Sequence, residues 1–241
     1  MNYVVIFAGG VGSRMDSSIP KQFLKVAGKP IIIHVLEVFS THPEIDGIVV
    51  VSKKEYIEEC KEYINTFDIS KVIDVIEGGF TGQESIRNGV IYINDRISNN
   101  SSEDVVLIHD GVRPLIDHKL ISDSIKCTKE NGNSIAASSA IETVITVDVE
   151  GRLKEIVDRS KCRNAKAPQC FILKDIYEAH KKAMSEGINN MIDSAMLMSS
   201  YGYKLFTTEC GPENIKITTP NDYYMFKGMY EHSGVVGEDD K

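Results

Sequence analysis

Short apolar runs alternate along the chain with longer amphipathic stretches. The apolar runs are rich in Val, Ile, Leu and Ala, which is typical of strands buried on both faces of a sheet. They cover residues 3–8, 47–52, 72–77, 104–109, 134–140 and 204–208. The amphipathic stretches predict helices over residues 31–40, 54–65, 82–94, 118–131, 174–184 and 222–230. This alternation predicts an α/β fold with a twisted, mostly parallel sheet between two layers of helices.

The alternation is interrupted once, between about residues 142 and 167. Two segments of high β-propensity, 143–149 and 153–157, flank Glu150-Gly151, a weaker form of the Asn-Gly hairpin turn. They predict a protruding β-arm that either packs against a second subunit or lies at the edge of the monomer. Because the chain shows no repeat and no linker, residues 1–232 are predicted to form one domain. The polar, acidic residues 233–241 are predicted to form a flexible tail.

Composition narrows the class of partner. The 241 residues carry a formal net charge of −8, which argues against a general electrostatic grip on nucleic acid. The five cysteines include no C-x-x-C pair, so we expect reduced thiols rather than disulfides or a zinc site. No apolar run reaches the length of a membrane span, and the first residues lack the features of a signal peptide. These features predict a cytoplasmic enzyme that contacts no membrane.

A glycine-rich turn follows the first predicted strand, where residues 8–14 read A-G-G-V-G-S-R. Glycines let backbone N–H groups approach an anion closely. The turn lacks the third glycine of the dinucleotide motif, because Met15 stands there, and the chain has no Walker motif. Arg14 in the turn and Lys21 soon after it suit the oxygens of a triphosphate. The turn therefore predicts a phosphate site, with a tight structural connection as the alternative.

A second candidate site follows the predicted strand 104–109, where residues 109–114 read H-D-G-V-R-P. Open α/β sheets bind ligands at the carboxyl ends of their parallel strands. Asp110 is therefore a candidate ligand for Mg²⁺ that bridges phosphates, with helix capping as the alternative. Arg113 either faces the nucleotide or braces Asp110, and the sequence leaves both roles open.

Three segments together resemble the opening of the sugar-nucleotide-forming nucleotidyltransferases. They are A-G-G-x-G-x-R-M at residues 8–15, P-K-Q-F-L at residues 20–24 and G-K-P-I at residues 28–31. More narrowly, the chain is similar to the cytidylyltransferases that make CDP-ribitol or CDP-methylerythritol, and the similarity extends to about residue 230. The resemblance implies a three-layer, Rossmann-like nucleotidyltransferase fold and a homodimer formed through the β-arm. It also implies CTP and a small polyol phosphate as substrates and Mg²⁺ or another divalent cation as cofactor.

The motifs and the resemblance together assign roles to individual residues. Those expected to be catalytic are Arg14, Lys21, Arg159 and Lys216. Those expected to bind the nucleotide are Ala8, Gly9, Gly10, Gly12, Gly78, Gly79, Ser85, Gly111 and Arg113. Those expected to bind the acceptor are Thr143, Arg159, Asp193 and Lys216, with Arg159 acting within one subunit or across the dimer. The expected metal ligand is Asp110, and the alternative for Asp193 is a carboxylate at a helix N-terminus.

The chain departs from the family pattern at three positions. Gly82 stands where the family has arginine, and Ala167 and Ile192 each replace a threonine. The details of the motifs favour D-ribitol 5-phosphate as acceptor, in a branch whose product feeds teichoic acid or capsule synthesis. The alternatives are 2-C-methyl-D-erythritol 4-phosphate of isoprenoid synthesis, another polyol phosphate such as a glycerol phosphate, and a module that senses CTP without turnover.

Overall fold

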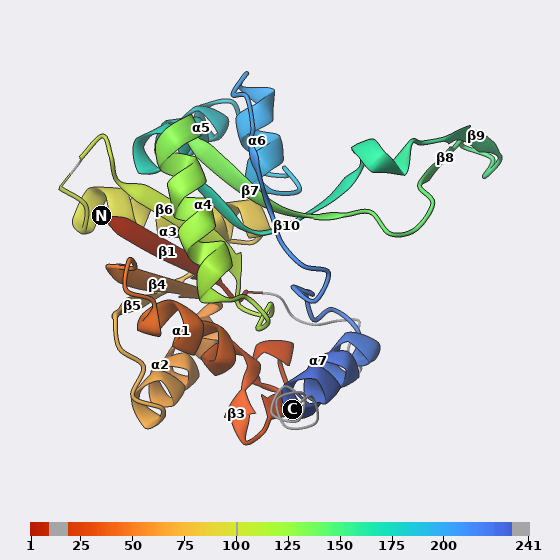
Figure 1. The fold of residues 1–241 in the computed structure, drawn as a ribbon. Coiled ribbons are helices and arrows are strands. Elements are labelled where there is room, and N and C mark those ends of the chain that lie inside the picture. The colour runs from red at the N-terminus through yellow and green to blue at the C-terminus, as the bar shows by residue number, and fades with distance from the viewer. Residues whose placement is uncertain (10–18, 100, 233–241) are drawn as a thin grey trace.

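The computed structural model describes residues 1–9, 19–99 and 101–232, and among them a seven-stranded sheet forms the centre (Figure 1). Its strands lie in the order β11 (Thr207–Glu209), β7 (Asn133–Ser139), β10 (Arg163–Ile172), β6 (Val105–Asp110), β1 (Asn2–Phe7), β4 (Gly47–Ser52) and β5 (Val72–Glu77). All neighbouring pairs are parallel except those of β10, which runs antiparallel to both β6 and β7. The predicted α/β fold with a mostly parallel sheet is confirmed.

Helices cover both faces of the sheet because successive strand side chains point to opposite faces. On β1, Val4 and Ile6 pack in one apolar cluster, and Tyr3 and Val5 pack in another. The first cluster is completed by helices α1 (Ile31–Thr41), α2 (Ile57–Thr66) and α4 (His118–Asn131). The second is completed by α3 (Gly82–Arg96), α5 (Leu173–Ser185) and α6 (Ser194–Ser200). The result is the expected three-layer arrangement.

The predicted helix α4 is confirmed at both ends, because local signals set them. The Asp117 side chain accepts a hydrogen bond from Leu120 N–H at the N-terminus. Gly132 takes a left-handed conformation, with φ of 89°, at the C-terminus. The predicted helix 54–65 instead divides into a 3-10 turn, Lys54–Tyr56, and α2.

Strand β10 and helix α6 are among the elements that were not predicted from the sequence. Strand β10 contains Pro168 and a register shift between Ala165 and Gln169, so its apolar positions show no regular period. Helix α6 has only seven residues, too few to display a helical pattern. A smaller apolar cluster joins helix α7 (Pro220–His232) to the short strands β2 (Lys25–Val26) and β3 (Lys29–Pro30).

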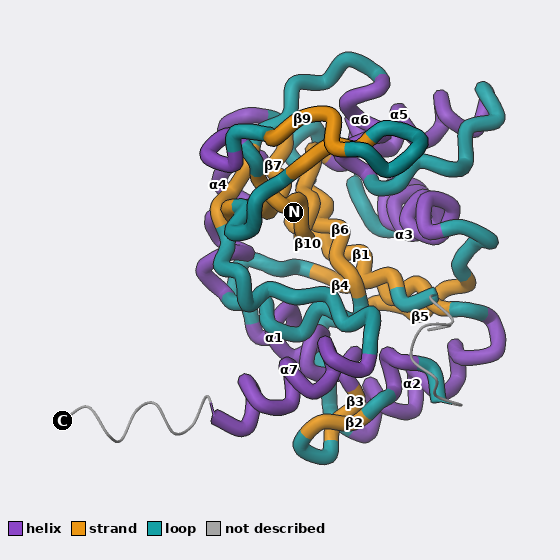
Figure 2. The backbone as a smooth tube through the Cα atoms, turned by 90° about the vertical axis from the view of Figure 1, so that its right-hand side faces the viewer, coloured by secondary structure: helices purple, strands orange, loops and turns teal. Residues whose placement is uncertain are grey.

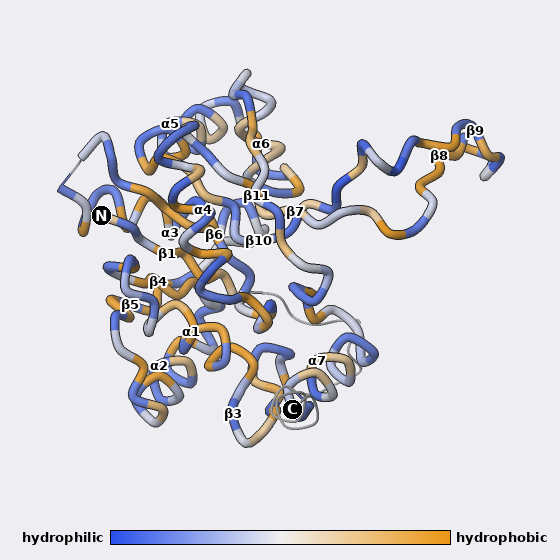
Figure 3. Tube along the Cα trace, viewed as in Figure 1, coloured by the Kyte–Doolittle hydropathy of each residue, from blue (hydrophilic) through white to orange (hydrophobic). Residues whose placement is uncertain are grey.

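The predicted β-arm is present and projects from the sheet (Figures 1 and 2). Strands β8 (Ile145–Val147) and β9 (Leu153–Ile156) pair antiparallel and are bonded to no other strand in the described part of the chain. Figure 3 shows that the arm carries apolar positions although it extends away from the core. None of the described helices is long and apolar enough to cross a bilayer. The predicted tail, residues 233–241, lies outside the described residues.

Candidate active site

The carboxyl ends of the parallel strands bring three predicted nucleotide-binding residues to one edge of the sheet. Ala8 directly follows β1, Gly78 follows β5 and Gly111 follows β6. Gly78 N–H donates to the Ser52 carbonyl at 2.8 Å, and Gly111 N–H donates to the Phe7 carbonyl at 3.0 Å. The sheet register therefore continues past the strand ends and fixes the positions of these backbones.

Ser85 organises the glycine turn between β5 and α3. Its hydroxyl donates to the Thr81 carbonyl at 3.0 Å and accepts from Gly79 N–H at 3.1 Å. A Cβ added at Gly78 would lie 2.8 Å from Ser85 Oγ, and one added at Gly9 would lie 3.6 Å away. The backbones at Gly9 and Gly78 thus approach the hydroxyl closely, and the turn requires glycine at Gly78. The predicted contacts of these residues with a nucleotide remain predictions.

A buried carboxylate with two cationic partners lies at the end of β6. Lys216 Nζ is 2.6 Å from Asp110 Oδ1, and Arg113 Nε is 3.3 Å from Asp110 Oδ2. Burial by itself would raise the pKa of Asp110, but the positive charges of Lys216 and Arg113 together lower it below its ordinary value. Asp110 is therefore ionised at neutral pH, and it holds Lys216 at the carboxyl end of the sheet.

Arg113 is buried and makes the bracing contact that the sequence left open. Besides Asp110, its guanidinium donates through Nη1 to the Asn214 carbonyl at 2.6 Å. The Arg113 carbonyl in turn lies 3.0 Å from His109 Nε2. Burial lowers the pKa of His109 to about 4, so its ring is neutral and serves to pack and orient this segment. A contact between Arg113 and the nucleotide remains a prediction.

Lys21 lies beside the segment that carries Lys216. Lys21 begins the 3-10 turn Lys21–Phe23, and its Nζ donates to the Ile217 carbonyl at 3.1 Å. The next residue, Gln22, is buried and donates to the Ala8 carbonyl at 3.0 Å, which ties this turn to the end of β1. The structure therefore brings together two predicted catalytic lysines that are far apart in the sequence. The predicted site residues Gly10, Gly12 and Arg14 lie outside the described residues.

The predicted acceptor-binding residues lie on other elements. Thr143 and Arg159 are exposed on the β-arm, where Arg159 Nη1 donates to the Ile141 carbonyl at 2.8 Å. Asp193 caps α6, because its Oδ1 accepts from Met196 N–H at 2.8 Å. Its Oδ2 accepts from the side chain of Gln169 at 2.9 Å. The capping alternative for Asp193 is thus realised, and its contact with an acceptor remains a prediction.

Sequence reasoning assigned no role to two buried amides that support this site. Asn214 donates from Nδ2 to the Ala167 carbonyl at 2.8 Å, while its own carbonyl accepts from Arg113. Gln169 joins Asp193 to the start of α6, because its Oε1 accepts from Ala195 N–H at 2.9 Å. Gln169 directly precedes an apolar run, and a polar residue in that position is too common to identify a site.

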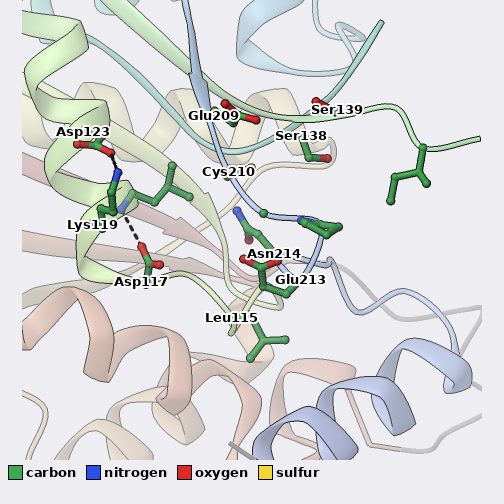
Figure 4. Close-up of a pocket in the computed structure, with 14 residues that line it drawn as sticks. Leu115, Asp117, Lys119, Asp123, Ser138, Ser139, Glu209, Cys210, Glu213 and Asn214 are labelled. Atoms are coloured by element: carbon green, nitrogen blue, oxygen red, sulfur yellow. Dashed lines mark hydrogen bonds and ion pairs between the residues drawn. The ribbon is translucent and has the colours of Figure 1, made fainter. Parts of the chain in front are cut away.

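The pocket in Figure 4 lies between α4 and the segment that follows β11. Four carboxylates line it, those of Asp117, Asp123, Glu209 and Glu213, while its one basic residue, Lys119, is paired with Asp123. None of the predicted site residues within the described part of the chain lines this pocket. Because four negative charges would repel a triphosphate, the Asp110 edge of the sheet fits a nucleotide better.

Comparison with known proteins agrees with this geometry. Residues 2–229 match the family model of 2-C-methyl-D-erythritol 4-phosphate cytidylyltransferase. The chain belongs to this cytidylyltransferase family. The chain is therefore a nucleotidyltransferase, as its glycine turn and basic residues predicted.

Individual relatives cover nearly the whole chain. A ribitol-5-phosphate cytidylyltransferase of Vibrio parahaemolyticus is 46% identical over 96% of both chains. A 2-C-methyl-D-erythritol 4-phosphate cytidylyltransferase of Clostridium novyi is 34% identical over 96% of this chain and 97% of its own. The crystal structure of 4-diphosphocytidyl-2C-methyl-D-erythritol synthase from Anaerococcus prevotii is similar with a TM-score of 0.82. It is 25% identical, over 95% of this chain and 96% of its own.

Proposed function

We propose that the chain transfers CMP from CTP to D-ribitol 5-phosphate, with CDP-ribitol and pyrophosphate as products. The observation that carries this proposal is the convergence of Lys21 and Lys216 on one segment, residues 216–217, beside Asp110 at the carboxyl end of β6. Two cations can stabilise the negative charge of a triphosphate, and exposed backbone N–H groups can bind its oxygens. The choice of acceptor is supported by identity. The relatives named for ribitol 5-phosphate reach 46% sequence identity with this chain, and those named for methylerythritol 4-phosphate reach 34%.

The proposed reaction is a single in-line displacement. An oxygen of the acceptor phosphate attacks the α-phosphorus of CTP, the bond to the β-phosphate oxygen breaks, and pyrophosphate leaves. A phosphate dianion is nucleophilic near neutral pH, so the step needs neither a general base nor a covalent enzyme intermediate. Lys21 and Lys216, with Arg14, stabilise the charge that develops on the phosphates. The Lys216 side chain is 41% exposed, so it can contact a phosphate while Asp110 holds it in place.

Asp110, at the end of β6, can supply one protein ligand to a divalent cation. Mg²⁺ is usually held by one or two carboxylates together with substrate phosphates and water. Asp110 is ionised, and a carboxylate has about four lone-pair positions, of which the contacts with Lys216 and Arg113 use two. We propose that Asp110 would hold Mg²⁺ here. When bound, the ion would neutralise charge on the triphosphate.

The exposed apolar side chains of the β-arm support a homodimer. Val149 is 103% exposed, and Ile145, Val147, Leu153 and Ile156 are each about half exposed or more. An isolated two-stranded hairpin is marginally stable in water, so covering these side chains would stabilise it. We propose that a second copy of the chain covers the arm. Arg159 then acts either in its own subunit or across the dimer.

Pyrophosphate release with CTP and a panel of polyol phosphates tests the proposed acceptor. The expected result is turnover with D-ribitol 5-phosphate at a kcat/KM at least tenfold above that with methylerythritol 4-phosphate or glycerol phosphate. Turnover only with methylerythritol 4-phosphate would overturn the choice of acceptor. CTP binding without turnover on any acceptor would favour the sensor.

Mixed dimers test whether Arg159 acts across the interface. Lys21→Ala and Arg159→Ala subunits are each expected to be nearly inactive alone. After exchange at equal concentrations, about half of the dimers are mixed, and each mixed dimer regains one intact site if Arg159 acts in trans. The expected activity is then about a quarter of that of the wild type. If mixing restores nothing, Arg159 acts within its own subunit or is not needed.

A further inference from the structure

Phe80 is an exposed aromatic side chain in the turn between β5 and α3, which carries Gly78 and Gly79 of the candidate site. It is 104% exposed, more than any other large apolar side chain in the described residues. A single exposed apolar residue is ordinary on a protein surface, and exposure alone indicates no function. The position of Phe80 is unusual for two further reasons, its fixed backbone and the empty space around it.

The backbone of Phe80 is held from both sides. Its N–H donates to Glu84 Oε2 at 2.7 Å, and the same oxygen accepts from Thr81 N–H at 3.2 Å. Glu84 N–H donates back to Thr81 Oγ1 at 3.1 Å, which completes the capping box of α3. The preceding peptide is fixed by the bond from Gly79 N–H to Ser85 Oγ. The ring therefore projects from a fixed backbone, and none of the residues that the structure describes covers it.

A second loop reinforces this support. Thr81 Oγ1 donates to the Asn189 carbonyl at 3.0 Å, and Gln83 Nε2 donates to the Ile188 carbonyl at 3.0 Å. Gln83 Oε1 also accepts from Met191 N–H at 2.9 Å. These bonds tie the turn to the segment that leads into α6, so the turn has little freedom to fold Phe80 onto the protein.

The turn around Phe80 is rich in glycine. Side chains of Ser85 and Glu84 fill the space at Gly78 and Gly79, whereas a Cβ added at Gly82 would meet nothing within 4 Å. A flat ring could therefore lie beside the turn, with its edge toward backbone N–H and C=O groups and its face toward Phe80. An aromatic ring recognises such a partner by stacking, which accepts any base.

We propose that Phe80 stacks on the cytosine of bound CTP and supplies affinity for the nucleotide at this turn. The inference rests on the proposed function, because it takes CTP as the ligand of the turn between β5 and α3. Stacking adds affinity without distinguishing one base from another, so hydrogen bonds at the base edge carry the selection of cytosine. Phe80 is thus a binding residue, and it takes no part in the chemical step.

Substitution at Phe80 tests the proposal by steady-state kinetics. Phe80→Ala is expected to raise the KM for CTP roughly 5- to 140-fold, the range that loss of one base–aromatic stack gives. The kcat, the KM for the acceptor and the melting temperature are expected to stay at the wild-type values, because Phe80 is fully exposed among the described residues. Phe80→Tyr should restore the KM, whereas Phe80→Leu should resemble Phe80→Ala. Met184→Ala, at an exposed position on α5, is the matched control.

A fluorescence experiment tests the same contact without turnover. The chain contains no tryptophan, so Phe80→Trp introduces a single reporter. CTP is expected to change its emission with saturation, and ribitol 5-phosphate alone is expected to leave it unchanged. The proposal is overturned if the KM for CTP of Phe80→Ala stays within twofold of wild type. It is also overturned if CTP binds Phe80→Trp in calorimetry without changing the emission.

The two tests separate this inference from the proposed function. If the enzyme is active but substitution of Phe80 does not change its KM for CTP, only the stacking role is overturned. A wild-type protein that turns over no acceptor, while Phe80→Trp still responds to CTP, overturns the proposed reaction and supports the stack.

Discussion

Replacing Arg113 with methionine is expected to destabilise the protein, because this arginine braces the interior of the site. Arg113 is 7% exposed, and its guanidinium bonds to Asp110 and to the Asn214 carbonyl. Methionine keeps an unbranched side chain of similar reach and removes the charge. The substitution therefore leaves one buried carbonyl without its donor and one buried carboxylate with a single cationic partner.

The size of the effect follows from these contacts. Removing one partner of a buried ion pair costs about 3–5 kcal/mol when the remaining charge is uncompensated. Lys216 Nζ still lies 2.6 Å from Asp110, so we expect a value near the lower end, about 3 kcal/mol. In a chain of this size, 1 kcal/mol corresponds to a shift of about 2–4 °C, which predicts a melting temperature lower by roughly 6–12 °C.

Thermal unfolding followed by circular dichroism, together with urea titration, measures this loss. Arg96→Met is the control, because Arg96 is exposed on α3 and its guanidinium lies 5.8 Å from the centre of the Tyr92 ring. Its expected cost is below about 1 kcal/mol. The bracing role is refuted if both variants melt within about 2 °C of wild type. A higher KM for CTP in a stable Arg113→Met variant would instead place Arg113 at the nucleotide.

Three further perturbations test other parts of the structure. Lys21→Ala is expected to lower kcat/KM by roughly 10²–10³, the usual loss when one transition-state donor is removed, and a near-wild-type rate would contradict its catalytic role. Gly78→Ala should raise the KM for CTP, because its Cβ would lie 2.8 Å from Ser85 Oγ, whereas Gly228→Ala on α7, whose Cβ would meet no atom within 4 Å, should leave that KM unchanged. Burial lowers the pKa of His180 to about 4. Between pH 6.5 and 4, His180 is therefore protonated in the unfolded chain and stays neutral in the folded chain. Stability should therefore fall as the pH falls through this range, and urea titrations should show that His180→Leu removes about 1.4 kcal/mol per pH unit from the slope. An unchanged slope would contradict this assignment.

Local patterns predicted most of the fold. The predicted strands 47–52 and 72–77 coincide with β4 and β5, and the predicted helix 118–131 coincides with α4. Continuous apolar runs and capping residues are short-range signals, so one segment of sequence suffices to recognise them. Strand β10 escaped recognition because it is defined by its partners, β6 and β7, rather than by its own pattern. Its antiparallel direction also follows from the chain returning from the β-arm.

The candidate site shows a similar division. Motifs identified Asp110, Lys21 and Lys216 as residues with chemistry suited to a triphosphate, and they identified the glycine turn. They could not reveal that Lys216 pairs with Asp110, or that Arg113 bonds to the Asn214 carbonyl across the fold. They also could not show that Phe80 stands free at the turn.

The sequence by itself determined the alternation of strands and helices, the β-arm and the chemical character of the residues near the strand ends, because these depend on neighbours along the chain. Only the tertiary structure decided which of those residues meet. The pairing of Asp110 with Lys216 depends on the sheet register and on the return of the chain toward α7, which bring together groups more than a hundred residues apart. Ion pairs act over a few ångströms, so their partners are chosen by the fold and cannot be read from spacing in the sequence.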